Sequence, residues 1–289
     1  MYFRKLVICF IACFLLVSLM PPIALAQNTA DGDGILEPGE NETEELARAA
    51  QNPMADLISF PIQNNTNFGF GPLDKTQNVT NIQPVIPFEL GEDWLLISRT
   101  IAPFIYQPEL IEGQGSEFGL GDISQALFIG PRNPGSFIWG AGPIFLLPTA
   151  TDKRLGAGKW GAGPACVGLT MRGPWVYGAL AQNIWSFADS GERKRDDVNQ
   201  FLLQYFINYN MADGWYLNSA PIITANWNAE SDNRWTVPFG AGVGKIFRIG
   251  KLPVNASIQA YYNVVKPDIL GPDWTLRFQI QFLFPKGRK

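Results

Sequence analysis

The last strand-like stretch of the chain, residues 274–284, restricts the possible fold more than any other segment. Every second residue in it is apolar, and the residues between them are polar. The apolar set is Leu276, Phe278, Ile280, Phe282 and Phe284, and the polar set is Thr275, Arg277, Gln279 and Gln281. Because side chains alternate between the faces of a β-strand, one face is apolar and one is polar. A soluble sandwich would bury the apolar face in a core, whereas a transmembrane barrel would turn it toward lipid.

A similar alternation of apolar and polar residues recurs from residue 57 to the end of the chain and predicts twelve strands. We expect them at 57–70, 77–90, 92–107, 117–130, 135–149, 158–171, 173–187, 197–210, 213–227, 234–247, 251–264 and 273–284. Short connections, such as 171–173 and 248–250, alternate with longer ones, such as 188–196 and 266–272. Outer-membrane barrels have short periplasmic turns and longer outer loops, whereas a Greek-key sandwich has no reason to alternate. The pattern predicts an all-β, antiparallel transmembrane β-barrel over 57–289 with both termini periplasmic.

Two irregularities interrupt this pattern. The segments 92–107 and 173–187 do not alternate cleanly, and Arg99 falls among apolar neighbours, which predicts either a bulge or a partly apolar lumen. Several predicted strands also contain proline, which cannot donate a ladder hydrogen bond. We expect bulges or strand ends at several of Pro84, Pro103, Pro143, Pro164, Pro221, Pro238 and Pro253.

The N-terminus has the features of a secretory signal peptide over residues 1–26. Arg4 and Lys5 precede an apolar run from Leu6 to Met20, and a small-x-small site over 24–26 follows. The alternative is a membrane anchor, but the run of about 15 residues is shorter than the ~20 that span a bilayer. We therefore expect export, cleavage and a place in the bacterial outer membrane.

Residues 27–56 carry eight acidic residues and one basic one, and we interpret them as a periplasmic segment that is disordered or forms a short helix. Within it, Asp31, Asp33 and Glu40 match positions three, five and twelve of a calcium loop. Thr29 stands where the first acidic ligand belongs. A solvated acidic tail is the favoured interpretation, and apart from this calcium candidate we expect no cofactor.

Composition narrows the class of function. The chain contains no histidine, which removes Ser-His-Asp and Cys-His catalysis and imidazole metal sites, so we expect no enzyme. No basic patch suggests nucleic acid as a partner. All nine tryptophans lie beside predicted turns or loops, as expected of aromatic girdles at two lipid interfaces.

Four short stretches together resemble a known family. They are Gly119-Leu120-Gly121-Asp122, the run Gly142 to Thr149, Gly173-Pro174-Trp175, and the closing strand from Phe278 to Phe284. They look like the outer-membrane transporter family named for the meta-pathway of phenol degradation, some of whose bacterial members carry the label "neuromedin U". The resemblance implies an outer-membrane barrel that passes or binds small organic molecules, and it supplies no catalytic residues. Barrels of this kind commonly end on the aromatic residue that the assembly machinery recognises, whereas five residues follow Phe284 here.

The first functional hypothesis is a porin-like channel or transporter for small, hydrophobic or aromatic solutes, with outer-membrane lipid, a solute and the barrel-assembly machinery as partners. Twelve strands predict a narrow lumen. The candidate lining residues are Gln83, Arg99, Asp122, Gln200, Gln204, Asn208, Asn218, Thr224, Asn226, Asn255, Gln259, Asn263, Arg277, Gln279 and Gln281. Amides dominate this set, which predicts weak charge selectivity, and Asp122 could pair with Arg99 or Arg277.

Three other hypotheses stay open at this point. The barrel could be closed and filled by side chains, serving as a structural or surface-loop protein without transport. A soluble all-β binding module and an enzyme complete the set, and the acidic N-terminal segment could act as a plug or bind a periplasmic partner.

Overall fold

The computed structural model describes residues 45–191 and 195–285. The predicted signal peptide and the calcium candidates Asp31, Asp33 and Glu40 lie outside these residues. All described residues belong to one compact unit, 37–289. It consists of a short helix at 45–50, two 3₁₀ turns, η1 (Ala212–Gly214) and η2 (Ser231–Asn233), and fifteen strands. The strands are β1 (Ile58–Phe70), β2 (Lys75–Ile82), β3 (Val85–Leu90), β4 (Trp94–Gln107), β5 (Glu117–Leu120), β6 (Ile123–Pro131), β7 (Phe137–Leu147), β8 (Lys159–Arg172), β9 (Trp175–Asp189), β10 (Asn199–Asn210), β11 (Trp215–Ser219), β12 (Ile222–Asn226), β13 (Trp235–Ile249), β14 (Leu252–Val265) and β15 (Trp274–Phe284).

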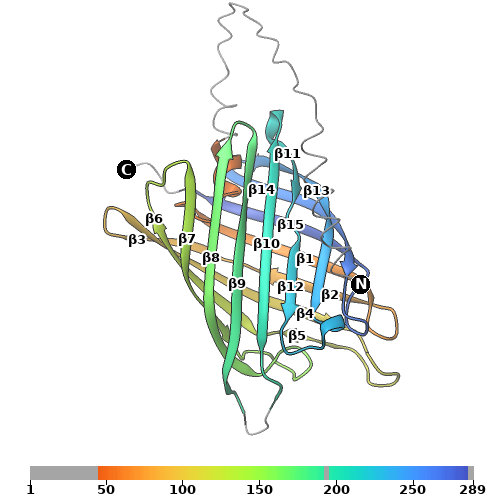
Figure 1. Cartoon of the computed structure of the whole chain (residues 1–289). Helices are drawn as coiled ribbons and strands as arrows, with labels where there is room; N and C mark the ends of the chain where they lie inside the picture. The colour runs from red at the N-terminus through yellow and green to blue at the C-terminus, as the bar shows by residue number, and fades with distance from the viewer. Residues whose placement is uncertain (1–44, 192–194, 286–289) are drawn as a thin grey trace, which may run out of the picture. The chain divides into compact units, whose positions relative to one another are not determined.

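The strands close into a single antiparallel barrel (Figure 1). β1 pairs with β15, and β9 pairs with β10, so the hydrogen-bonded ring has no free edge. Three positions around the ring hold two short strands in place of one long strand: β2 with β3, β5 with β6, and β11 with β12. The wall is therefore twelve strands around, which confirms the predicted strand number and direction.

The splits coincide with residues that disfavour regular pairing. Pro84 and Pro221 lie at two of them, and the register of β13 shifts between Val237 and Pro238. The expectation of strand ends or bulges is thus confirmed at these three prolines. Pro143 and Pro164 instead lie directly opposite each other in continuous strands.

Two ends of the barrel can be distinguished by their connections. At the terminal end, where β1 begins and β15 ends, the turns are 91–93, 132–136, 173–174, 211–214 and 250–251. At the opposite, loop end, the connections are 71–74, 108–116, 148–158, 190–198, 227–234 and 266–273. Most loop-end connections are longer, as the sequence predicts.

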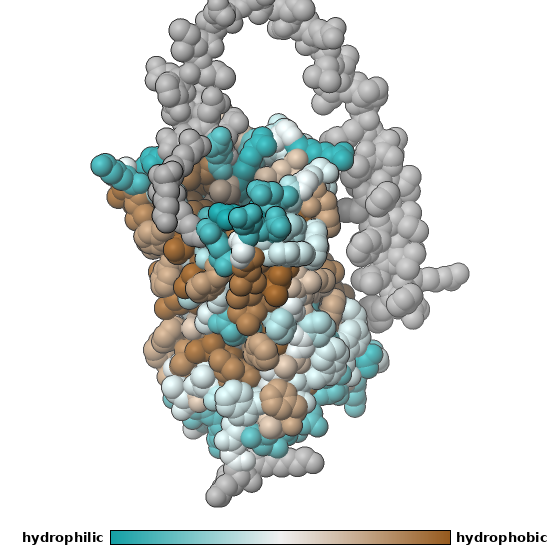
Figure 2. Space-filling model, turned by 90° about the vertical axis from the view of Figure 1, so that its left-hand side faces the viewer, coloured by the Kyte–Doolittle hydropathy of each residue, from teal (hydrophilic) through white to brown (hydrophobic). Residues whose placement is uncertain are grey.

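Large apolar side chains cover the outside of the barrel. Phe60, Phe239, Ile258 and Phe278 are exposed although their neighbours in sequence point inward. Figure 2 shows hydrophobic residues across the middle of one face and hydrophilic residues gathered at both ends. A closed barrel with an apolar belt is the architecture of a bacterial outer-membrane protein. Among the described residues, no helix is both long and apolar enough to cross a bilayer.

Tryptophans mark both rims of this belt. Trp94, Trp139, Trp175 and Trp215 lie near the terminal end, and Trp160, Trp185, Trp227, Trp235 and Trp274 lie near the loop end. Seven of them are more than 40% exposed, namely Trp94, Trp139, Trp160, Trp175, Trp185, Trp215 and Trp274. Indole rings prefer the interfacial zone of a bilayer, so this placement fits the girdles expected from the sequence.

One outward-facing area departs from the apolar pattern. Asn64 and Thr66 on β1 lie opposite Thr80 and Asn78 on β2. Asn64 Nδ2 donates to Asn78 Oδ1 at 2.7 Å and to Thr80 Oγ1 at 2.8 Å, and Asn78 Nδ2 donates to Thr66 Oγ1 at 3.0 Å. These four residues, the outer polar cluster, satisfy one another without help from solvent.

The assignment of the apolar flank to lipid predicts a sharp difference between two neighbouring residues of β10. Leu203 faces outward near mid-strand, whereas Gln204 faces the interior. Leu203→Arg should destabilise the barrel by about 2–4 kcal/mol, because it places a guanidinium in hydrocarbon. Gln204→Arg should cost less, since the inner face already holds polar groups. Denaturant unfolding in lipid vesicles measures both, and equal losses would contradict the assignment.

Candidate functional site: the barrel interior

The interior of the barrel has one apolar and one polar wall. Inward-facing residues of β4 and β6 to β9 form a continuous apolar cluster. Its buried members from these strands are Leu95, Ile97, Ala126, Phe128, Ile144, Ala165, Val167, Leu180 and Ile184. No register shift interrupts the pairing of β4 with β6 around Arg99, so a partly apolar interior, and not a bulge, accounts for that segment. In the segment 173–187 the pairing of β9 with β8 does shift, between Trp160 and Gly161, so an irregularity is found there.

The polar wall is a chain of amides that links two arginines across β4, β1 and β15. Arg99 donates from one terminal guanidinium nitrogen to Gln83 Oε1 at 2.9 Å, and Gln83 Nε2 donates to Gln63 Oε1 at 3.5 Å. Gln63 Nε2 donates to Asn65 Oδ1 at 3.4 Å, and the same oxygen accepts from Arg277 Nε at 2.9 Å. We call these five residues the amide belt.

The belt continues into the split between β11 and β12. Arg277 also donates to Gln259 Oε1 at 3.3 Å and to the backbone oxygen of Ala220 at 2.9 Å. The Tyr261 hydroxyl accepts from the Ala220 N–H at 3.1 Å and donates to Gln259 Oε1 at 2.6 Å. Backbone groups released by the split are thus satisfied from inside the barrel, as a membrane wall requires.

Residues 45–57 fill the terminal end of the interior. Ala47 packs against Tyr216 and Ile246, and Met54 joins the apolar cluster. Arg48 donates to the backbone oxygen of Gly173, and Gln51 Nε2 donates to Asn210 Oδ1 at 2.8 Å. This floor segment is therefore held on two sides of the barrel mouth by packing and by hydrogen bonds.

Glycines on the wall make room for Met54. A Cβ at Gly140 would lie 2.5 Å from the Met54 sulfur, and a Cβ at Gly130 would lie 2.8 Å from its terminal methyl. Real Cβ contacts are not that short, so a side chain at Gly140 or Gly130 would displace the end of Met54 from its present position.

Loop 148–158 covers part of the loop end and is anchored by Asp122. One carboxylate oxygen accepts from the Ala150 N–H at 3.1 Å, and the other accepts from the Ala157 N–H at 2.6 Å and the Gly158 N–H at 3.3 Å. Thr149 Oγ1 donates to the Gly121 oxygen at 3.0 Å and accepts from the Ile123 N–H at 2.9 Å, so the loop also repairs the split between β5 and β6. The carboxylate of Asp122 bonds this loop and is not engaged with Arg99 or Arg277, whose acceptors are amide and backbone oxygens.

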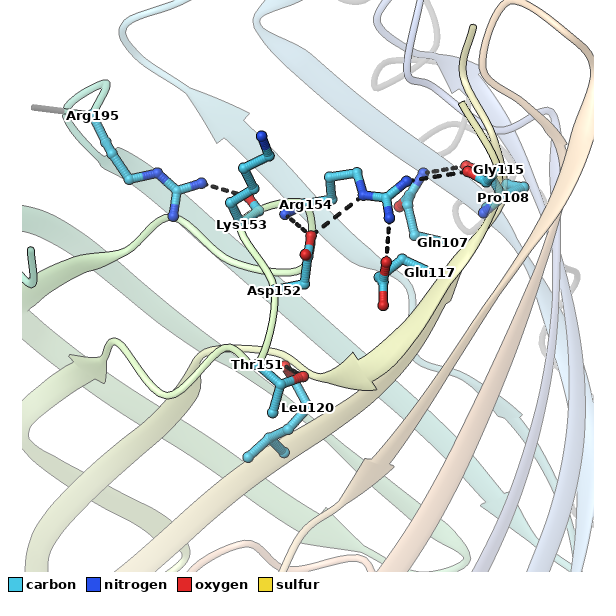
Figure 3. A network of polar contacts seen from close by, with 10 residues as sticks. All are labelled: Gln107, Pro108, Gly115, Glu117, Leu120, Thr151, Asp152, Lys153, Arg154 and Arg195. Carbon is cyan, nitrogen blue, oxygen red and sulfur yellow. Dashed lines mark hydrogen bonds and ion pairs between the residues drawn. The ribbon is translucent and has the colours of Figure 1, made fainter. Parts of the chain in front are cut away.

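Charged side chains tie the same loop to its neighbours (Figure 3). Arg154 pairs with Glu117 and, at 3.3 Å, with Asp152, and Arg195 donates to the backbone oxygen of Lys153. The backbone N–H of Arg154, together with its guanidinium, lowers the pKa of Asp152. Lys159, almost fully buried, pairs with Asp189 at 2.7 Å and Asp197 at 3.0 Å. These contacts hold the loop over the mouth.

Exposure of the inward-facing residues changes along the barrel axis. Near the terminal end they are buried, as at Asn208, Asn255 and Gln281. Toward the middle and the loop end, Asn65, Ile101 and many others are only half-buried. Gln107, Lys159 and Asn263 are the exceptions, since they are buried at the loop end. The interior is therefore packed at the terminal end and partly open toward the loop end.

The candidate lining residues predicted from sequence fall into three groups in this gradient. The buried ones are Gln83, Asn208, Asn218, Asn255, Gln259, Asn263, Arg277 and Gln281. Those that are half-buried are Arg99, Gln204, Thr224 and Gln279. Gln200 and Asn226 are exposed at the loop end, and Asp122 holds loop 148–158.

Sequence reasoning missed several interior residues. Gln63 lies on the parity opposite Phe60 and Ile62 in β1, and that alternation could have identified it. Asn65 stands in a run of polar residues that points to neither face. Tyr216 and Tyr261 face inward with buried hydroxyls, because each bonds an interior amide oxygen at 2.6 Å.

Comparisons with known proteins agree with this architecture. No protein-family model matches the chain, and no curated protein matches it either. Among solved structures it is similar to the COG4313 outer membrane channel from Pseudomonas putida F1, at 18% identity and a TM-score of 0.58, covering 78% of this chain and 93% of that one. Weaker likenesses are outer membrane phospholipase A from Escherichia coli (13% identity, TM-score 0.42, 83% and 98% covered) and a Pseudomonas aeruginosa FadL homologue (9%, 0.40, 87% and 95%). The chain thus has the fold of an outer-membrane β-barrel.

Proposed function

We propose that this protein is an outer-membrane channel that admits small, largely apolar organic solutes from its loop end. The observation that carries the proposal is the graded interior. Its loop half is partly open, an apolar wall runs from there into the terminal half, and the floor segment closes the terminal half. A barrel that served only as a scaffold would have no need of an accessible interior.

The proposed orientation places the terminal end in the periplasm. Shorter turns and both ends of the barrel domain lie there, as is usual for outer-membrane barrels. Solute would then enter from outside, move along the apolar wall, and leave when the floor segment is displaced. The similarity to an outer membrane channel of Pseudomonas putida supports the interpretation of this barrel as a channel.

The closed-barrel alternative rests on one observation, the packing of Met54 and Ala47 at the terminal end. It predicts a protein that conducts nothing even when the segment leaves. The absence of histidine removes imidazole-based catalysis from consideration for this interior.

Reconstitution of the mature chain into liposomes tests the proposal. We expect vesicles containing the protein to take up benzenesulfonate, an aromatic solute whose charge keeps it from crossing bare lipid, faster than empty vesicles. Deletion of residues 27–56 should increase this rate. Uptake that equals that of empty vesicles for both proteins would favour the closed barrel.

A further inference from the structure

Among the described residues, the formal charges inside the barrel at mid-depth are all positive. Inward-facing positions of the described strands, away from the strand ends, hold two formally charged side chains, Arg99 and Arg277, and no carboxylate. The carboxylates that face inward lie at the ends, where Glu117 pairs with Arg154 and Asp189 with Lys159. A guanidinium stays protonated at any physiological pH, so the middle of the interior carries a fixed positive charge.

The partners of both arginines are neutral. Arg277 donates to Asn65, Gln259 and Ala220, and its guanidinium lies 4.9 Å from the centre of the Tyr261 ring. These contacts orient the group without cancelling its charge. A buried charge that keeps only neutral partners is costly, which makes it a sign of function when it lies inside a membrane barrel.

Arg99 differs from Arg277 in having fewer hydrogen-bond partners and a partly exposed surface. It is half-buried and gives one hydrogen bond, to Gln83. A guanidinium has five N–H donors in a planar fork, so Arg99 keeps donors for a ligand in the geometry that suits a carboxylate.

Arg99 also lies where the polar wall meets the apolar wall, and we call this boundary the seam. Gln83 lies on one side of it, and Ala126 of the apolar cluster lies opposite it on β6. Along its own strand, the inward neighbours are Ile97 and Ile101, and Ile101 is half-buried. A ligand held here would have its charged end at the guanidinium and its body against aliphatic side chains.

We propose that the seam at Arg99 is a binding site for monocarboxylates with a compact apolar body, and that Arg99 and Arg277 make the lumen anion-selective. This inference rests on the proposed channel function and names the class of solute that the channel prefers. It replaces the weak charge selectivity that the many amides suggest, because amides contribute dipoles and the two guanidiniums contribute the net charge.

Three probes of similar size separate charge from shape: benzoate, benzamide and benzylamine. Binding to the detergent-purified full-length mature protein is measured by calorimetry, and ion selectivity is measured from the reversal potential in a potassium chloride gradient. We expect benzoate to bind at least about tenfold more tightly than benzamide, the effect of one charge-assisted hydrogen bond, and benzylamine to bind weakest. The open channel should prefer chloride.

Substitutions test whether Arg99 causes the preferences for benzoate and for chloride. Arg99→Gln should abolish the preference for benzoate and reduce the preference for chloride, whereas Arg99→Lys should retain part of both. Lys245→Gln is the matched control, since it removes one positive charge from a residue beside Trp215 on the outer face. It should leave both preferences unchanged, and heat-modifiable gel migration shows whether each variant is folded.

The two proposals fail in different ways. Equal binding of benzoate and benzamide by the wild-type protein, or an unchanged preference in folded Arg99→Gln, would overturn the carboxylate site even in a conducting channel. Absence of conductance together with Arg99-dependent benzoate binding would overturn the channel and retain the site.

Discussion

Met54→Asp is expected to open the terminal end of the barrel while leaving the barrel folded. Met54 packs within the apolar cluster that includes Phe128 and Ile144. A carboxylate in that place costs roughly 3 kcal/mol or more, which lowers the equilibrium constant for docking of the floor segment about a hundredfold. The strand pairing does not use Met54, so the wall should persist. Planar-bilayer recording should show a larger and steadier single-channel conductance than that of the wild type.

The matched control for this variant is Met54→Leu, which keeps an apolar side chain of similar volume. It should retain wild-type conductance and the same heat-modifiable migration. If Met54→Asp and wild type conduct equally, then the floor segment does not limit passage, and the gate must be sought at loop 148–158.

Asp122→Asn is expected to release loop 148–158 from the wall. The carboxylate accepts three backbone N–H groups of this loop. An amide keeps one acceptor oxygen and brings an NH₂ group against backbone donors, and each unsatisfied donor costs about 1–3 kcal/mol. The released loop exposes Lys153 and Arg154, so limited trypsin digestion of intact vesicles should cleave there about tenfold faster or more. Chloride conductance should change with it.

Asp152→Asn provides the control in the same loop. Asp152 accepts from the backbone N–H of Arg154 at 2.8 Å and from its Nε at 3.3 Å, so it shapes the turn without anchoring it to the wall. Its cleavage rate should stay near that of the wild type. Fast cleavage in both variants, or in neither, would show that Asp122 is not the anchor.

Much of the wall could be predicted from sequence because lipid and lumen impose opposite demands on alternate residues. In β14, Asn255 and Gln259 face the interior while Ile258 and Tyr262 face outward, as the alternation predicts. Proline chemistry likewise located two of the three splits, since Pro84 and Pro221 cannot donate to a ladder. The third split, at Gly121 and Asp122, has no such residue.

The candidate site was harder to predict because its parts are brought together by closure of the barrel. The amide belt joins Gln63 to Arg277, more than two hundred residues apart, and no local pattern connects them. Asp122 shows the same difficulty, because its partners are backbone N–H groups of a loop, and backbone groups leave no trace in the residue types. Met54 lies in an acidic segment for which a plug was one of the hypotheses, but no residue pattern there marks Met54 as the one that packs inside the barrel.

The outer polar cluster makes substitutions at four residues depend on one another. Asn64, Thr66, Thr80 and Asn78 are tolerable beside hydrocarbon because each has its hydrogen-bond partners among the other three. Replacing one of them by leucine would strand donors and acceptors of the rest where no water can reach, a worse state than four apolar residues. Sequences that diverge from this one should therefore keep the quartet or exchange it as a block, with few intermediates surviving between the two.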